Sequence, residues 1–92
     1  MALSFLTQEI AMDLGTANTV IFRNDEIVMD APSIVAIDNN SGKCIAIGRQ
    51  AKLMHEPTNP GLKTIRPLRN GVIADFTAAA LMIKGFIKQV NS

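Results

Sequence analysis

Short blocks of apolar residues alternate with polar turns along most of the chain, a pattern typical of short β-strands. The apolar blocks of the first half are residues 10–12, 20–22, 27–29, 34–37 and 44–47. The first three are joined by tight polar turns and predict an antiparallel meander. Ala31-Pro32 is expected to break this sheet, because proline has no N–H to donate to a strand pair.

The next segments predict a second, smaller β-rich unit. The block 34–37 is continuously apolar, as expected for a strand buried on both faces. Polar residues 38–43 then form a loop or hairpin that leads into the strand 44–47. A short helix over 48–55, a surface loop over 57–61 and a brief strand over 62–66 follow. The Asn70-Gly71 turn leads into residues 72–74.

The last segment predicts a helix over residues 76–90. Asp75 is a good N-cap for it, since its carboxylate can accept a backbone N–H of the first turn. A metal or acid–base role for Asp75 is the alternative. The face at helical spacing is expected to be Phe76, Ala79, Ala80, Ile83, Ile87 and Val90, widened by Ala78, Leu81, Met82 and Phe86. So broad an apolar surface predicts a sandwiched helix, and Gly85 in its middle predicts close packing against another backbone.

The turn at residues 13–19, between the first two strands, carries the candidate chemistry. Gly15 lets the backbone approach an anion closely, and the side chains of Thr16, Asn18 and Thr19 add hydrogen-bond donors. Asp13, at the end of the first strand, could hold a hydrated Mg²⁺ through its waters. The residue types of this turn are equally compatible with an ordinary hairpin that has polar residues at its tip.

Composition limits what else the chain can be. Its 92 residues make one domain or a piece of one, and they are 48% hydrophobic. Mean hydropathy is +0.22, which predicts surface that more protein covers. The net charge of +1, with no Tyr or Trp, argues against a nucleic-acid partner. No apolar run reaches the roughly 18 residues of a membrane span.

Three further features of the sequence have ordinary structural explanations. Cys44 is the only cysteine, which excludes an internal disulfide, fits a reducing cytosol and predicts a small core residue. His55 is also alone, and Glu56 beside it does not make a zinc site. Residues 1–9 lack the features of a signal peptide. Their apolar side chains (Leu3, Phe5 and Leu6) either touch a lipid interface or belong to a frayed terminus or a strand that leads into the fold.

These motifs in this order resemble the actin-like ATPase fold shared by actins, heat-shock chaperone ATPases and sugar kinases. Within that superfamily the chain is most similar to the MreB-type bacterial actins, the rod shape-determining proteins. The similarity rests on residues 13–19, 32–37, 65–68 and 70–76 and extends from about residue 10 onward. Many members of that family carry Asp where this chain has Asn70.

The resemblance implies an α/β fold class: the N-terminal part of domain I of the actin-like ATPase fold. An antiparallel β-meander would carry a small inserted β-rich subdomain and a long C-terminal helix. Residues 1–31 and 67–92 would belong to subdomain IA, and residues 32–66 to subdomain IB. The residues implied to bind the nucleotide are Gly15, Thr16, Ala17, Asn18 and Thr19, with Asp13 near Mg²⁺ in a complete cleft and no catalytic residue assigned.

The family resemblance implies a cytoplasmic protein that binds ATP and Mg²⁺ and assembles into membrane-associated filaments. Its partners would be further copies of itself and the cell-wall morphogenesis proteins at the inner membrane, and its role would be to maintain rod shape. The second phosphate loop, the adenosine motif, the catalytic glutamate and the second domain of the family have no counterpart in these 92 residues. We therefore expect that this chain alone neither binds ATP appreciably nor hydrolyses it.

Two other interpretations stay open at this stage. The chain could be a short self-associating or partner-binding module from a truncated or split gene, independent of nucleotide. It could also be a fragment of a kinase or a chaperone ATPase, which would need motifs that these residues do not contain.

Overall fold

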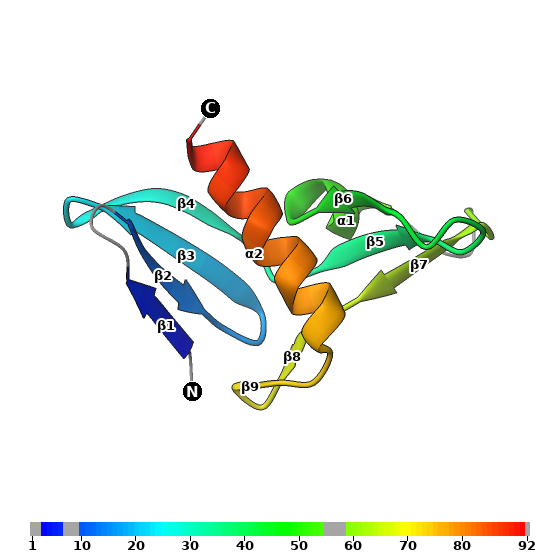
Figure 1. The fold of residues 1–92 in the computed structure, drawn as a ribbon, viewed down its shortest axis with the longest axis horizontal. Coiled ribbons are helices and arrows are strands. Elements are labelled where there is room, and N and C mark those ends of the chain that lie inside the picture. Colours follow the sequence, from blue (N-terminus) through cyan, green and yellow to red (C-terminus); the bar gives the residue numbers. More distant parts are fainter. Residues whose placement is uncertain (1–2, 7–9, 55–58, 92) are drawn as a thin grey trace.

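The computed structural model describes residues 3–6, 10–54 and 59–91. They form two antiparallel sheets and a long helix that runs across the junction between the sheets (Figure 1). The predictions that concern His55, Glu56 and the first part of the 57–61 loop lie outside these residues. In the described part, no helix is long and apolar enough to cross a membrane.

The first sheet has four strands in the order β1-β2-β3-β4. These are β1 (Leu3–Leu6), β2 (Ile10–Leu14), β3 (Asn18–Arg23) and β4 (Glu26–Pro32). The predicted meander is therefore present, and β1 adds a fourth strand. Of the alternatives considered for the first residues, the described part of that segment is a strand that leads into the fold. Asn24 and Asp25 form the β3–β4 turn with φ of 52° and 65°, which Asn and Asp tolerate better than other residues with a side chain.

Strand β4 continues further than expected. Ala31 and Pro32 pair with Thr19 and Asn18, so they end the strand instead of interrupting it. The expected break of the sheet therefore falls directly after Pro32, and the next strand belongs to the second sheet. Ala31 and Pro32 themselves can pair because β4 is an edge strand, where a missing N–H leaves no neighbouring strand unpaired.

The second sheet has three strands in the order β6-β5-β7, formed by β5 (Val35–Asp38), β6 (Cys44–Ile47) and β7 (Leu62–Ile65). Strand β5 is central, and Val35 and Ala36 are fully buried, as its continuous apolar pattern predicted. In the hairpin that follows, hydrogen bonds from the Ser41 hydroxyl and the Asn40 N–H hold the pKa of Asp38 below its usual value. The short helix α1 (Arg49–Leu53) packs beside β5 and β6.

A two-stranded hairpin, β8 (Leu68–Arg69) and β9 (Val72–Ile73), connects the second sheet to helix α2 (Phe76–Val90). The predicted Asn70-Gly71 turn joins its strands, with φ of 53° and 79°. Both angles are left-handed, as a two-residue hairpin turn requires. Helix α2 has the predicted bounds, and Asp75 caps it by accepting the Ala78 N–H at 2.9 Å.

Helix α2 joins the two sheets into one hydrophobic core. Met82 and Phe86 are buried in one hydrophobic cluster with Met12, Leu14 and Ile21 of the first sheet and Val35 of the second. The predicted inward face was partly wrong. Ala78, Ala79, Met82 and Phe86 are buried, whereas Ala80 is exposed and Phe76 is 76% exposed. The helix is thus covered on one side by the described residues.

Two further packing predictions are refined. A Cβ added at Gly85 would collide with the Cδ1 atom of Ile47, so the glycine accommodates a side chain and not a backbone. Cys44 is half-buried and packs against the main core, as expected for a small apolar residue.

We expect Asp75→Ala to lower the free energy of unfolding by about 1 kcal/mol, because the Ala78 N–H then loses its partner. Asp75→Asn keeps an oxygen acceptor and should stay within a few tenths of a kcal/mol of the parent. Urea denaturation followed by circular dichroism measures both. Equal losses in the two variants would contradict the capping role.

Candidate functional site

The candidate site is the loop between β2 and β3. The Gly15 N–H donates to the Asn18 carbonyl at 3.0 Å and closes a tight turn, so the predicted strand–turn–strand unit is present. Thr16, Ala17 and Asn18 are exposed on this turn. A Cβ added at Gly15 would lie 2.5 Å from the Asn18 carbonyl oxygen, so a side chain here would collide with the backbone of the turn. The loop depends on glycine at this position.

Ser33, directly after β4, supports the loop through two hydrogen bonds. The Ser33 N–H donates to the Ala17 carbonyl at 2.9 Å. The hydroxyls of Thr19 and Ser33 are hydrogen-bonded at 2.8 Å, and both residues are fully buried. Thr19 is therefore the member of the predicted set whose side chain is enclosed. Any contribution it makes to a ligand comes through the loop that it supports.

The two exposed polar side chains of the loop already have protein partners. The Thr16 Oγ1 accepts the Gly71 N–H at 2.8 Å, which ties the loop to the β8–β9 hairpin. This bond uses a lone pair of the hydroxyl and leaves its proton free to donate. The Asn18 amide donates to the Asp30 Oδ1 at 3.2 Å, which orients the side chain along the sheet.

Asp13 lies on β2 directly before the loop. Met12 and Leu14 face the core, so the side chain of Asp13 is on the opposite face of the sheet. Asp13 pairs with Val20, which pairs in turn with Asp30, so the two carboxylates flank one apolar residue on that face. The Asp13 Oδ1 is enclosed and has no hydrogen-bond partner among the described residues.

An enclosed carboxylate oxygen with no donor is costly unless another group satisfies it. A water of a hydrated Mg²⁺ would do so, and the position of Asp13 therefore fits the role that the sequence predicted. No group of three or more His, Cys, Asp or Glu suited to a metal occurs in the described part of the chain. A cation at Asp13 would thus be held mainly by water and by ligand oxygens.

Sequence reasoning missed three residues of this arrangement: Asp30, Ser33 and the backbone of Gly71. Each lies far along the chain from its partner in the loop, with separations of 12, 14 and 55 residues. Ser33 follows Pro32 in a segment that already carried the family resemblance, which was the available signal.

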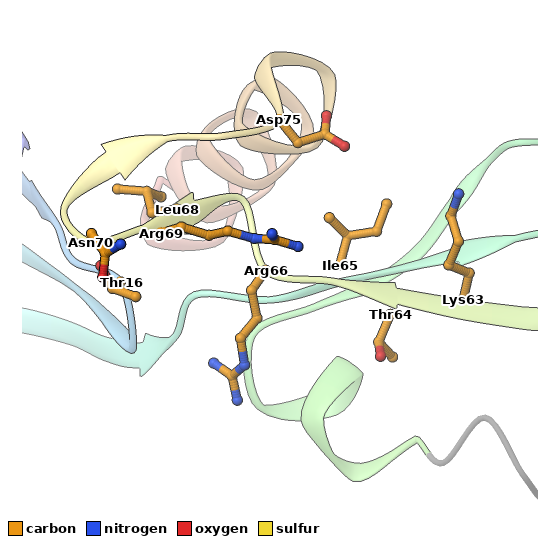
Figure 2. Close-up of a pocket in the computed structure, with 9 residues that line it drawn as sticks. All are labelled: Thr16, Lys63, Thr64, Ile65, Arg66, Leu68, Arg69, Asn70 and Asp75. Atoms are coloured by element: carbon orange, nitrogen blue, oxygen red, sulfur yellow. The ribbon is translucent and has the colours of Figure 1, made fainter.

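A hollow of about 660 Å³ lies beside the loop and shares Thr16 with it (Figure 2). It is bordered by β7, β8 and the start of α2. Its other lining residues are Lys63, Thr64, Ile65, Arg66, Leu68, Arg69, Asn70 and Asp75.

The model of the MreB/Mbl protein family matches residues 7–92. The chain belongs to the MreB/Mbl family. The cell shape-determining protein Mbl of Bacillus subtilis strain 168 is 46% identical over 85 residues, which cover 91% of this chain and 26% of that protein. The cell shape-determining protein MreB of Pasteurella multocida is 44% identical over 91 residues, which cover 94% of this chain and 26% of that protein.

The chain is also similar to solved structures of an MreB protein. MreB5 of Spiroplasma citri bound to ADP matches with a TM-score of 0.75 and 33% identity, over 87% of this chain and 25% of that one. The same protein bound to AMPPNP matches with a TM-score of 0.77 over 88% of this chain. The chain thus has the actin-like MreB fold and spans about a quarter of the length of the relatives it matches.

We expect Gly15→Ala to destabilise the protein by roughly 1–3 kcal/mol, because the new methyl group overlaps a backbone oxygen that cannot rotate away. Gly61→Ala is the matched control, since nothing lies within 4 Å of its added Cβ. It should change stability by less than about 0.5 kcal/mol. Chemical denaturation compares the two, and similar effects would show that the loop tolerates a side chain.

We expect Thr19→Val to cost about 1–3 kcal/mol, because the Ser33 hydroxyl is then buried without a partner. The double variant Thr19→Val/Ser33→Ala removes both hydroxyls and should cost less than the sum of the single changes. A thermodynamic cycle from urea denaturation measures the coupling. Additive costs would mean that the two hydroxyls do not support each other.

Proposed function

We propose that this chain forms the phosphate-binding wall of a nucleotide site in a bacterial actin-like cell-shape protein. The observation that carries the proposal is the exposed Gly15–Asn18 turn directly after the enclosed, unpartnered Oδ1 of Asp13. Family membership supports it, since MreB5 of Spiroplasma citri has been solved with ADP and with AMPPNP.

Each residue would have a distinct role in this wall. Backbone N–H groups of Thr16 and Ala17 would bind phosphate oxygens, and the free proton of the Thr16 hydroxyl would add a donor. The Asn18 side chain would contact the ligand from a position fixed by Asp30. Thr19 would support the turn through Ser33. Asp13 would hold Mg²⁺ through water, and the bound ion would neutralise charge on the phosphates.

The division of the chain follows from the same proposal. The first sheet and α2 would belong to subdomain IA, as residues 1–31 and 67–92, and the second sheet to subdomain IB, as residues 32–66. The separate hydrogen bonding of the two sheets supports this division. As a part of the whole protein, the chain would take part in ATP-dependent filaments in the cytoplasm. These filaments would associate with the membrane and guide cell-wall synthesis together with morphogenesis proteins.

A second candidate function is nucleotide-independent self-association or partner binding. The exposed apolar side chains of Phe76, Leu53 and Ile27 favour it, at 76%, 70% and 63% exposure. Light scattering with and without Mg-ATP separates the two functions. Assembly that needs nucleotide supports the first, whereas a stable oligomer without nucleotide supports the second.

We expect Mg-ATP to bind these 92 residues only weakly, because Thr16, Ala17 and Asn18 face solvent and one wall supplies one side of a site. At millimolar Mg-ATP, amide chemical shifts in NMR spectra should change at residues 13–18 and at Gly71. Thr16→Val keeps the shape of the side chain but removes the hydroxyl, and it should reduce the changes at Gly71. Saturable binding at sub-millimolar ATP in calorimetry would contradict the expected weakness.

Shift changes spread over the surface, or centred away from the loop, would contradict the proposed site itself. Titrations with ATP alone and with Mg²⁺ alone serve as controls. A change at Asp13 that requires Mg²⁺ and ATP together supports its role with the ion.

A further inference from the structure

The hollow beside the loop carries an excess of positive charge. Lys63, Arg66 and Arg69 are exposed along it, and no described carboxylate forms an ion pair with any of them. Asp75 is the acidic residue in its lining, and its Oδ1 is already engaged by the Ala78 N–H at the start of α2. The hollow therefore presents cations that are available to a ligand.

The spacing of these cations excludes a compact ligand. Lys63 and Arg66 are three residues apart at the end of β7, and Arg69 follows after the bend at Pro67. At about 3.3 Å per residue, Lys63 and Arg66 stand roughly 10 Å apart along the backbone. Figure 2 shows the side chains of Lys63 and Arg66 leaving the ribbon in opposite directions. A single phosphate or carboxylate group cannot contact all three, so the matching ligand is elongated and carries several charges.

The surface between the cations favours a peptide over a polynucleotide. Ile65, which is half-buried, lies between Lys63 and Arg66 and lines the hollow. Among the described residues, no aromatic side chain lines the hollow to stack with bases. A peptide can present carboxylates to the cations and an apolar side chain to Ile65. Arginine binds carboxylates in a bidentate manner, which suits Arg66 and Arg69.

We propose that this hollow is a docking site for an extended acidic peptide segment of a partner protein. The segment would place separate carboxylates at Lys63, Arg66 and Arg69 and an apolar residue at Ile65. Binding does not require nucleotide, because the cations belong to β7, β8 and their connection and not to the β2–β3 loop. The hollow adjoins the proposed nucleotide site, with which it shares Thr16.

The test uses a fluorescein-labelled peptide, Glu-Glu-Leu-Glu-Glu-Leu-Glu-Glu, titrated with the full 92-residue chain and followed by fluorescence anisotropy. We expect saturable binding that weakens with salt. The double variant Arg66→Gln/Arg69→Gln should weaken it about tenfold, because two charge-assisted contacts are lost. Lys43→Gln/Arg49→Gln removes the same charge from exposed positions outside the hollow and should change the dissociation constant less than about twofold.

Equal weakening by the two double variants would overturn the proposal, since only net charge would then matter. So would binding of the corresponding Gln-Gln-Leu peptide with the same affinity. Tripolyphosphate or a single-stranded oligonucleotide that binds more tightly than the peptide, and depends on Arg66 and Arg69, would also overturn it. Thermal denaturation confirms that each variant is folded, and Lys63→Gln/Arg69→Gln is the replacement pair if Arg66 is needed for folding.

Discussion

Burial of one face of α2 against both sheets is the constraint on which the rest of the structure depends. Neither sheet has a helix of its own long enough to cover its inner face, because α1 has only five residues. Met82 and Phe86 are fully buried and belong to one hydrophobic cluster with residues of both sheets. The two sheets therefore share one core, although no strand pair among the described residues connects them by hydrogen bonds. The position of the β2–β3 loop relative to the second sheet follows from this packing.

The loop itself is positioned by bonds from two distant segments. Ser33 fixes it from beneath at the point where the chain passes from one sheet to the other. Gly71 fixes it from the side, next to the start of α2. A ligand that binds the loop would thus bind a segment that is hydrogen-bonded to Ser33, between the two sheets, and to Gly71, before α2. These hydrogen bonds brace an exposed, glycine-dependent turn in a chain of only 92 residues.

Much of the fold was predictable because its signals are local. The bounds of α2 follow from Asp75 as cap and the apolar residues behind it, and the strand over residues 44–47 follows from its flanking polar turns. The inward face of α2 was not predictable in the same way. Nearly all its positions are apolar, so periodicity could not choose between Phe76 and Phe86. The choice is made by which face meets the two sheets.

The same distinction between local and long-range signals applies to the candidate site. Gly15, Thr16 and Asn18 could be identified from the sequence because their residue types suit a phosphate-binding turn. The partners of the loop could not, since Asp30 and Ser33 reach it only through the pairing of β3 with β4. The buried position of Thr19 was hidden for the same reason. A threonine in a polar run has the same residue type whether its strand turns it inward or outward.

The hydrogen bond between Gly71 and Thr16 also affects the deamidation of Asn70. In an Asn-Gly dipeptide the glycine nitrogen can attack the preceding side-chain amide, releasing ammonia and closing a succinimide ring. In this hairpin that nitrogen is Gly71 N, and its proton is held by the Thr16 Oγ1 at 2.8 Å. Ring closure requires this bond to open first. The chemical lifetime of Asn70 is therefore coupled to the integrity of the loop, and deamidation there would report on how often the two hairpins separate.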